Sequence, residues 1–321
     1  MRIVVLAGGI GGARFLTGVR GWAGRHGADV TAVVNVADDV TLHGLRICPD
    51  LDSVMYTLGG GADPERGWGR AGETWAVKDE LAAYRAEPTW FGLGDKDVAT
   101  HLVRTRMLDA GYPLSAVTEA LCARWQPGIR ILPASDDRVE THVVVESTTG
   151  EDSAIHFQEW WIRHRGQLAA KRFVFVGAET ASPGAGVLGA LAEADVVLLA
   201  PSNPVVSIAP ILAVAALRAA LVDGKAPVVG VSPIIGGAPV RGMADACLAA
   251  LDVPCTAAGV GTLYGGRGAG GILDAWLVDT SDADTEVAGV RVRPTPLWMT
   301  DEAATEAMVV SALDEAGVAG D

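Results

Sequence analysis

Short apolar runs that each end in a glycine-rich or polar turn most limit the folds open to this chain. Residues 3–6 form one such run and lead into AGGIGGARF, and residues 30–36 form a second. Unbroken apolar runs of this length are typical of strands buried on both faces, as in parallel sheets covered by helices. The pattern returns at residues 195–200 and 228–231. We therefore expect an α/β fold, a Rossmann-like and mostly parallel sheet with helices on both faces.

The segment between these two groups of apolar runs has a different residue pattern. Residues 77–126 read as mostly helical, with Val98, Leu102 and Val103 at helical spacing. Residues 140–176 contain THVVVES and AIHFQEWWIRHR, which favour β-strands. We expect residues 77–175 to form an inserted α+β cap with substrate contacts. Residues 1–76 and 176–321 would then form the nucleotide-binding core.

Charge and composition limit the class of partner. The chain has 321 residues and a formal net charge of -14, whereas a general nucleic-acid binder normally shows a basic face. We expect small-molecule substrates and no nucleic acid. The four cysteines include no CxxC pair, which indicates reduced thiols. The apolar start is too short for a signal peptide, and no run reaches about 18 apolar residues, so we expect a cytoplasmic protein without membrane contact.

The first glycine turn predicts a phosphate contact. It contains Gly8, Gly9, Gly11 and Gly12, followed by Arg14. Glycines let backbone N–H groups approach a phosphate, and the N-terminus of the following helix favours negative charge. The alternative is a tight strand–helix turn that needs glycine only for its geometry. The dinucleotide fingerprint GxGxxG fails because Arg14 takes the last glycine position, which argues against a nicotinamide-dependent oxidoreductase.

Four aspartates, Asp38, Asp39, Asp50 and Asp52, surround the end of the second apolar run. Clustered carboxylates repel one another unless a cation, a proton or a donor joins them. Magnesium commonly bridges protein carboxylates and substrate phosphates. Each aspartate also has a plain alternative, because Asp39 can close a turn and Asp50 and Asp52 can support the start of a helix at Pro49. Taken together, the four favour a metal or polar-ligand site.

Two later turns follow buried strands. The first, PSNP, contains Ser202 and Asn203, and the second, SPIIGG, contains Ser232. Open α/β sheets bind ligands at the carboxyl ends of their strands, where these hydroxyl and amide groups could contact a nucleotide. The alternative is a pair of ordinary strand–helix turns.

Two further blocks offer acceptor contacts. In GLGDKD, Lys96 lies between two acids and could reach a ligand hydroxyl or phosphate, or could simply form surface ion pairs. In HFQEWW, Trp160 and Trp161 could form a platform for a flat heterocycle, or could pack into the core. No serine, cysteine or histidine stands in a nucleophile–base context. This favours chemistry by positioning and electrostatics, as in metal-assisted phosphoryl transfer.

These blocks together resemble the CofD/FbiA family, and they run in order through nearly the whole chain. They are GGIGGAR at 8–14, NVADD at 35–39, CPDLDSVMYTL at 48–58, GLGDKDVATHL at 92–102, LPASDD at 132–137, HFQEWW at 156–161, APSNPVVSI at 200–208 and SPIIGG at 232–237. The resemblance implies a 2-phospho-L-lactate or phosphoenolpyruvate transferase of coenzyme F-420 biosynthesis. The terminal ribityl hydroxyl of the deazaflavin Fo would attack a guanosine diphosphate conjugate of lactate or enolpyruvate. GMP would leave with Mg2+ assisting, and the protein would be a homodimer.

The resemblance also implies roles for residues. Asp52 and Lys96 match positions associated with Fo, while Asp38 is the first candidate magnesium ligand and Asp50 the second. Asp38 and Asp52 are thus the candidate catalytic residues. The glycine turn and the two later turns would hold the guanosine diphosphate portion. The GGIGGAR, RICPD and HFQEWW spellings look more like the actinobacterial branch and favour the enolpyruvyl donor. The alternative function is a non-catalytic nucleotide-sugar-binding regulatory protein of related fold.

Overall fold

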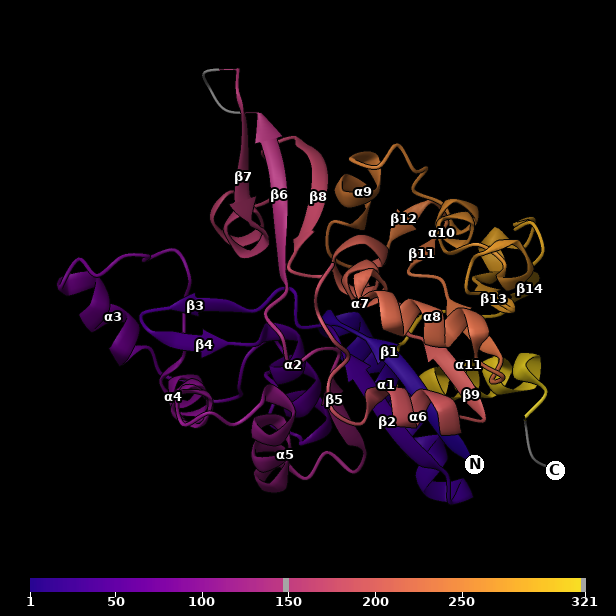
Figure 1. The fold of residues 1–321 in the computed structure, drawn as a ribbon, viewed down its shortest axis with the longest axis horizontal. Coiled ribbons are helices and arrows are strands. Elements are labelled where there is room, and N and C mark those ends of the chain that lie inside the picture. The colour runs from indigo at the N-terminus through magenta and orange to yellow at the C-terminus, as the bar shows by residue number, and fades with distance from the viewer. Residues whose placement is uncertain (147–149, 319–321) are drawn as a thin grey trace.

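A sheet of seven strands forms the centre of the computed structural model, which describes residues 1–146 and 150–318 (Figure 1). Its order is β14-β13-β10-β9-β1-β2-β5, and every pairing is parallel. The strands are β1 (Arg2–Ala7), β2 (Asp29–Val34), β5 (Arg130–Pro133), β9 (Val196–Leu199), β10 (Val228–Val231), β13 (Ala275–Val278) and β14 (Arg291–Pro294). The predicted α/β fold with a parallel sheet is confirmed.

Helices cover both faces of this sheet because successive side chains of each strand point to opposite faces. In β1, Ile3 and Val5 belong to one buried cluster, whereas Val4 and Leu6 belong to the other. The first face is covered by α1 (Gly9–His26), α2 (Pro49–Leu58), α5 (Leu114–Trp125) and α11 (Glu302–Ala316). The second face is covered by α6 (Val187–Glu193), α7 (Ala209–Ala213), α8 (Ala215–Asp223), α9 (Ala244–Ala249) and α10 (Ala257–Tyr264).

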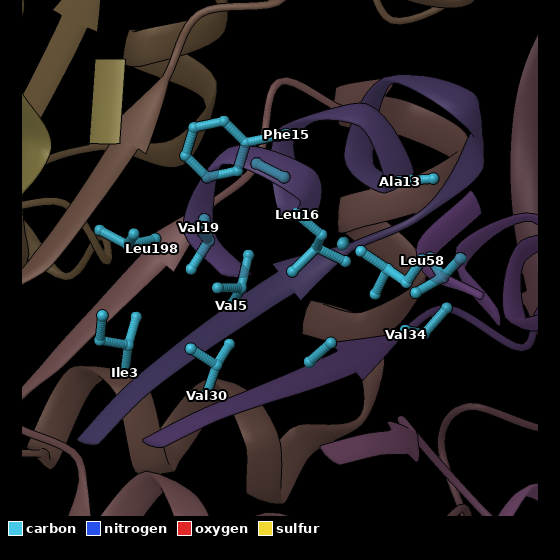
Figure 2. Packing of buried hydrophobic residues seen from close by; sticks show 14 of the residues in the cluster. Ile3, Val5, Ala13, Phe15, Leu16, Val19, Val30, Val34, Leu58 and Leu198 are labelled. Carbon is cyan, nitrogen blue, oxygen red and sulfur yellow. The ribbon is translucent and has the colours of Figure 1, made fainter. Parts of the chain in front are cut away.

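The packing of α1 on the sheet shows how the first face is built. Figure 2 shows Phe15, Leu16 and Val19 of α1 beside Val5 of β1 and Val30 of β2. All five side chains are buried. This contact fixes the direction in which α1 leaves the end of β1, and therefore fixes the position of the glycine turn between them.

Smaller elements surround the sheet (Figure 1). A three-stranded antiparallel sheet is formed by β6 (Glu140–Glu146), β7 (Asp152–His156) and β8 (Ala170–Val176). Two hairpins are β3 (Val40–Leu42) with β4 (Leu45–Ile47), and β11 (Ile234–Ile235) with β12 (Ala238–Pro239). The other helices are α3 (Ala76–Ala83), α4 (Asp95–Asp109), the single π-turns η1 (Glu159–Arg163) and η2 (Pro204–Ile208), and the 3₁₀ turns η3 (Arg267–Ala269) and η4 (Thr280–Asp282).

The structure divides residues 77–175 differently from the expected cap. The antiparallel strands β6, β7 and β8 do form a layer of their own, as Figure 1 shows. Strand β5 lies in the same range, yet it pairs with β2 at the edge of the main sheet. Helix α5 packs into the main core beside it. The core therefore includes residues 114–133, a segment whose strand is too short to show an apolar run.

Three local expectations need correction. Strand β2 ends at Val34, two residues before the end of its apolar run. The stretch after β7 turns into the helix η1 instead of continuing as a strand. Helix α4 exposes Leu102 and Val103, which are 54% and 48% accessible, and buries polar side chains instead. Apolar spacing misassigned that face because α4 packs on a charged partner.

Among the described residues, no single helix has both the length and the apolar composition needed to cross a bilayer. The bent pair Pro204–Ala213 and Ala215–Asp223, which turns through 88°, meets that criterion only when its two helices are taken together.

Candidate active site

The carboxyl ends of β1 and β9 lie side by side where the strand order of the sheet reverses, because β1 connects to β2 on one side and pairs with β9 on the other. Such switch points are where open α/β sheets bind ligands. Gly8 follows β1 and Ser202 follows β9. The Gly8 N–H donates to Ser202 Oγ at 3.1 Å, and that hydroxyl donates to the Gly8 carbonyl at 2.7 Å. The two turns are thus joined into one surface.

Gly8 is required here by close packing rather than by an unusual backbone angle. Its backbone is extended, with φ at −161°, and α1 begins at Gly9 without a side-chain cap. A Cβ atom added to Gly8 would lie 2.6 Å from Asp50 Oδ2 and 2.7 Å from Ser207 Cβ, which is closer than real contacts allow. The first turn of α1 leaves backbone N–H groups without helical partners, and such groups bind anions.

Asp50 reaches this turn from the first residues of α2. Asn35, which follows β2, donates from Nδ2 to Asp50 Oδ2 at 3.0 Å and to the Val206 carbonyl at 3.2 Å. Burial raises the pKa of Asp50 to about 6, while hydrogen bonds from Asn35 and from the Gly9 N–H oppose the rise. A carboxylate in this position has an unfavourable free energy unless further positive charge approaches it.

Asp38 is the second carboxylate of this cluster. It is 4% exposed, and its Oδ1 has no hydrogen-bond partner among the described residues. Burial raises the pKa of Asp38 well above its usual range, and the charges of Asp50 and Asp39 add to the rise. Asp38 and Asp50 are therefore two enclosed carboxyl groups, next to an anion-binding helix end, whose ionisation is unfavourable.

This arrangement fits a divalent cation that is shared with a phosphorylated ligand. Among the residues that the structure describes, no three His, Cys, Asp or Glu side chains come together closely enough to hold a metal ion by themselves. Magnesium is usually held by one or two carboxylates together with substrate phosphates and water. Asp38 with its free oxygen and Asp50 match that description, whereas a cage made of protein ligands alone does not form.

Asp39 belongs to a different pair. It is fully buried, and its Oδ2 lies 3.1 Å from Arg46 Nη2. Burial raises the pKa of Asp39 to about 6, and the positive charge of Arg46 opposes the rise. Its backbone N–H donates to the Val36 carbonyl at 3.2 Å, whereas the side chain that forms an Asx turn after β2 is Asn35, whose Oδ1 accepts from the Ala37 N–H at 3.0 Å.

Asp52, on the same helix as Asp50, pairs with side chains of α4. It forms a buried ion pair with Arg104 of α4, and its Oδ2 lies 3.7 Å from His101 Nδ1. Burial raises the pKa of Asp52, and the positive charge of Arg104 opposes the rise. The four aspartates therefore divide into a pair at the glycine turn, one that pairs with Arg46, and one that faces α4.

Three predicted turn residues form internal hydrogen bonds. Ser202 bonds to Gly8 as described above. Asn203 Oδ1 accepts from the N–H groups of Val205 and Val206 and caps η2. Ser232 Oγ accepts from the Ile234 N–H at 3.1 Å and donates to its carbonyl at 2.9 Å. These side chains shape the turns, and the backbone around them is what faces the switch point.

Lys96 and Arg14 lie on exposed parts of the molecule. Lys96 occupies the first turn of α4, where its Nζ donates to the Ala71 carbonyl at 3.2 Å and its N–H donates to Glu73 at 2.8 Å. Lys96 therefore joins α4 to the loop at 61–75. Arg14 is exposed on α1. Gly9, Gly11 and Gly12 lie in the first turns of α1, beside the switch point.

The two tryptophans of HFQEWW differ. Trp160 is 1% exposed, packs against Phe157 and Phe173, and donates from Nε1 to the Leu168 carbonyl at 2.8 Å. Its ring is enclosed by the core, as the plainer interpretation expected, and offers no open face. Trp161 is partly exposed and lies parallel to Phe157 with ring centroids 6.5 Å apart. Only Trp161 keeps a surface that could stack on a ligand.

Several site residues had no predicted role. Asn35 links Asp50 to the η2 turn, and its position directly after β2 is the signal that points to it. Arg104 and His101 had no such signal, because the apolar residues between them suggested the opposite helix face. Long-range packing alone brings α4 against α2.

A hollow of about 300 Å³ lies beside the site and not at the Asp38–Asp50 pair. Arg46 contacts both this hollow and Asp39. The lining residues are Thr41, Gly44, Arg46, Thr105, Leu108, Asp109, Leu114, Asp136 and Arg138. Within the carboxylate pair, Asp38 Oδ1 is the buried oxygen without a hydrogen-bond partner among the described residues.

Comparison with known proteins gives a consistent picture. Residues 3–316 match the family described as 2-phospho-L-lactate transferase CofD. The chain is 61% identical over 319 residues to a phosphoenolpyruvate transferase of Nocardia farcinica, covering 99% of this chain and 95% of that protein. Proteins of the same name from Mycolicibacterium smegmatis and Mycobacterium tuberculosis are 57% and 58% identical, each covering 99% of both chains.

Solved structures agree with the fold. A crystal structure of a protein of the UPF0052 family from Bacillus halodurans aligns with a TM-score of 0.61. The alignment covers 97% of this chain and 99% of that one, at 19% sequence identity. At this identity the likeness concerns the fold alone, and it shows that the parallel sheet and its added layers occur together in another protein.

Proposed function

The chain belongs to the 2-phospho-L-lactate transferase CofD family, and we propose that it transfers a phosphoenolpyruvyl group to the deazaflavin Fo in coenzyme F-420 biosynthesis. The donor would be a guanosine diphosphate conjugate of enolpyruvate, and GMP would be released. The relatives at 57–61% identity that are named phosphoenolpyruvate transferase support enolpyruvate over lactate as the transferred group.

The enclosed Asp38–Asp50 pair beside the glycine turn is the observation that carries this proposal. The N–H groups at the start of α1 suit the oxygens of a diphosphate. The carboxylates would repel that polyanion, so the site needs a cation between them. Asp38 and Asp50 would hold Mg2+, which when bound supplies charge neutralisation to the diphosphate. The hydrogen bonds that join the Gly8 and Ser202 turns support a fixed surface on which the protein would hold the donor.

The acceptor would approach from the side of α2 and α4. Asp52 would contact the ribityl hydroxyl and accept its proton, so that oxygen attacks the phosphorus and the bond to the GMP oxygen breaks. Lys96 and Trp161, which both keep accessible surface, are proposed acceptor contacts. Positioning of this kind accounts for a site without a nucleophile, because phosphoryl transfer mainly requires in-line placement and charge neutralisation. The homodimer implied by the family resemblance is part of the same proposal.

Product identification tests this function. The protein would be supplied with Fo, Mg2+ and either the enolpyruvyl or the lactyl conjugate of guanosine diphosphate, and the products would be identified by mass. We expect GMP and the enolpyruvyl phosphodiester of Fo from the first mixture, at a higher rate than from the second. Tight nucleotide binding without any product from either donor would contradict transfer and favour the non-catalytic alternative.

A further inference from the structure

The middle of helix α4 buries polar side chains and exposes apolar ones. Arg104 and His101 are 1% and 0% exposed, whereas Leu102 and Val103 between them face solvent. Burying a charged group costs free energy unless partners compensate it. A helix that buries polar side chains and exposes apolar ones therefore needs a specific set of partners. Those partners are Asp52 on α2 and Asp97 one turn earlier on α4.

The hydrogen-bond pattern determines how the group is ordered. Arg104 Nη1 lies 2.9 Å from His101 Nδ1, and a guanidinium can only donate, so Nδ1 is the acceptor. The imidazole proton is then on Nε2, which lies 3.3 Å from Asp97 Oδ2. Asp97 also accepts from the Tyr56 hydroxyl at 2.6 Å. Asp97, His101 and Arg104 thus form one chain of contacts that ends at Asp52.

Asp52 is held on one side only. Its Oδ1 accepts from Arg104 Nη2, whereas its enclosed Oδ2 has no hydrogen-bond partner among the described residues. Arg104 Nη1 contacts His101 Nδ1 and the Arg46 carbonyl at 3.3 Å, which fixes the plane of the guanidinium. A planar donor fixed in this way determines where the unpartnered oxygen of the carboxylate points.

We propose that Arg104, oriented by His101 and Asp97, is a positioning residue that sets the direction of Asp52 for the acceptor hydroxyl. The inference rests on the proposed function, in which Asp52 contacts the acceptor. It goes beyond that function because it gives Asp97, His101 and Arg104 of α4 a role in the reaction as well as in stability. Arg104 acts through Asp52 and does not touch either substrate.

A double-mutant comparison separates this role from a structural one. We expect Arg104→Met to lower kcat by about 100-fold, the size of effect that a displacement of about 1 Å produces. Donor-nucleotide affinity should be unchanged, because the Gly8 turn is not altered. In an Asp52→Asn background the same change should alter acceptor affinity and residual kcat by no more than about twofold, because its target is already absent. Arg104→Lys keeps the cation and should recover part of kcat.

Three further variants distinguish a positioning role of Arg104 from a structural one. Leu102→Ala on the exposed face of the same helix should leave kcat and both affinities unchanged. If Arg104→Met does not fold, Asp52→Asn/Arg104→Met removes both charges together, and His101→Gln disturbs the guanidinium without unpairing it. An equal loss of kcat from Arg104→Met with and without Asp52, or full kcat in Asp52→Asn, would overturn the inference while transfer by the unmodified protein still stands. Absence of transfer by the unmodified protein would instead overturn the proposed function.

Discussion

At the scale of single residues, the site contains two buried carboxyl groups whose ionisation costs free energy. Asp38 and Asp50 are both enclosed, and each raises the cost of ionising the other. Hydrogen bonds from Asn35 and from the Gly9 N–H to Asp50 oppose this. Buried charge without a full set of partners destabilises a fold, and sites that bind charged ligands commonly keep it because the ligand completes the set.

The change Asp38→Asn should raise stability and abolish transfer. The folded-state pKa of Asp38 lies above its unfolded value of 3.8, so the stability of the protonated form is fully present below that value. This stability is lost as the pH rises through the folded pKa. Asparagine cannot lose a proton. In the absence of divalent cations, the melting temperature of the Asp38→Asn variant should therefore exceed that of the unmodified protein by about 2 °C or more at pH 8. This gain in melting temperature should shrink toward pH 4.

Melting curves at both pH values check this prediction, with turnover measured at saturating Mg2+. The exposed carboxylate of Asp29 on β2 offers a matched control, and Asp29→Asn should change neither property. A melting temperature for Asp38→Asn below that of the unmodified protein at pH 8 would show that the carboxylate is already compensated inside the fold.

The positions of single residues, as distinct from their roles, were predictable where a local turn defines them. Gly8 and Asp50 occupy the site because both belong to turns that directly follow or precede regular elements. Trp160 shows the limit, because the sequence alone could not tell an inward ring from an outward one in HFQEWW. Arg104 shows the opposite failure, since its partner Asp52 lies 52 residues away in the sequence.

At the scale of elements, the start of α1 is the part that joins the fold to the site. The helix packs on β1 and β2 through Phe15 and Val19, and this packing leaves its N-terminus at the switch point. Gly8 has Asp50 on one side and the Ser202 turn on the other, with no room for a methyl group. The glycine therefore controls the separation between the helix end and the carboxylate.

The change Gly8→Ala should weaken nucleotide binding because the added methyl group displaces Asp50 and Ser207. We expect at least a tenfold loss of affinity for GDP, about 1.4 kcal/mol, measured by calorimetry. Gly24 lies exposed on α1 with open space around it, so Gly24→Ala is the matched control. That variant should bind GDP normally and be more stable by about 0.5–1 kcal/mol. Equal affinities for the two variants would show that the glycine serves only the helix.

Elements with a strong local pattern were predictable, and those defined by distant pairing were not. Helix α2 begins at Pro49 and buries Leu51, Val54 and Met55, as its spacing indicates. Strand β5 has only four residues and becomes part of the sheet solely through its pairing with β2. No local signal can reveal a partner nearly 100 positions away, so the division of residues 77–175 had to come from the structure.

At the scale of the whole molecule, the strand order determines where chemistry can occur. The chain winds from β1 outward through β2 to β5, and then from β9 outward to β14 on the other side. The reversal leaves β1 and β9 adjacent, and their turns face the same edge of the sheet. Asp38 and Asp50 reach that edge from β2 and α2, and the antiparallel layer contributes Thr141 beside them. The position of the candidate site is therefore a consequence of the strand order.

Binding of GDP with and without Mg2+ tests the central claim most directly, namely that the Asp38–Asp50 pair and the glycine turn hold a diphosphate through a shared cation. By calorimetry, Mg2+ should tighten GDP binding to the unmodified protein by at least tenfold, about 1.4 kcal/mol. The change Asp50→Asn should remove most of that dependence while Leu102→Ala keeps it. Equal affinity for GDP in Mg2+ and in a chelator, in the unmodified protein, would contradict the account.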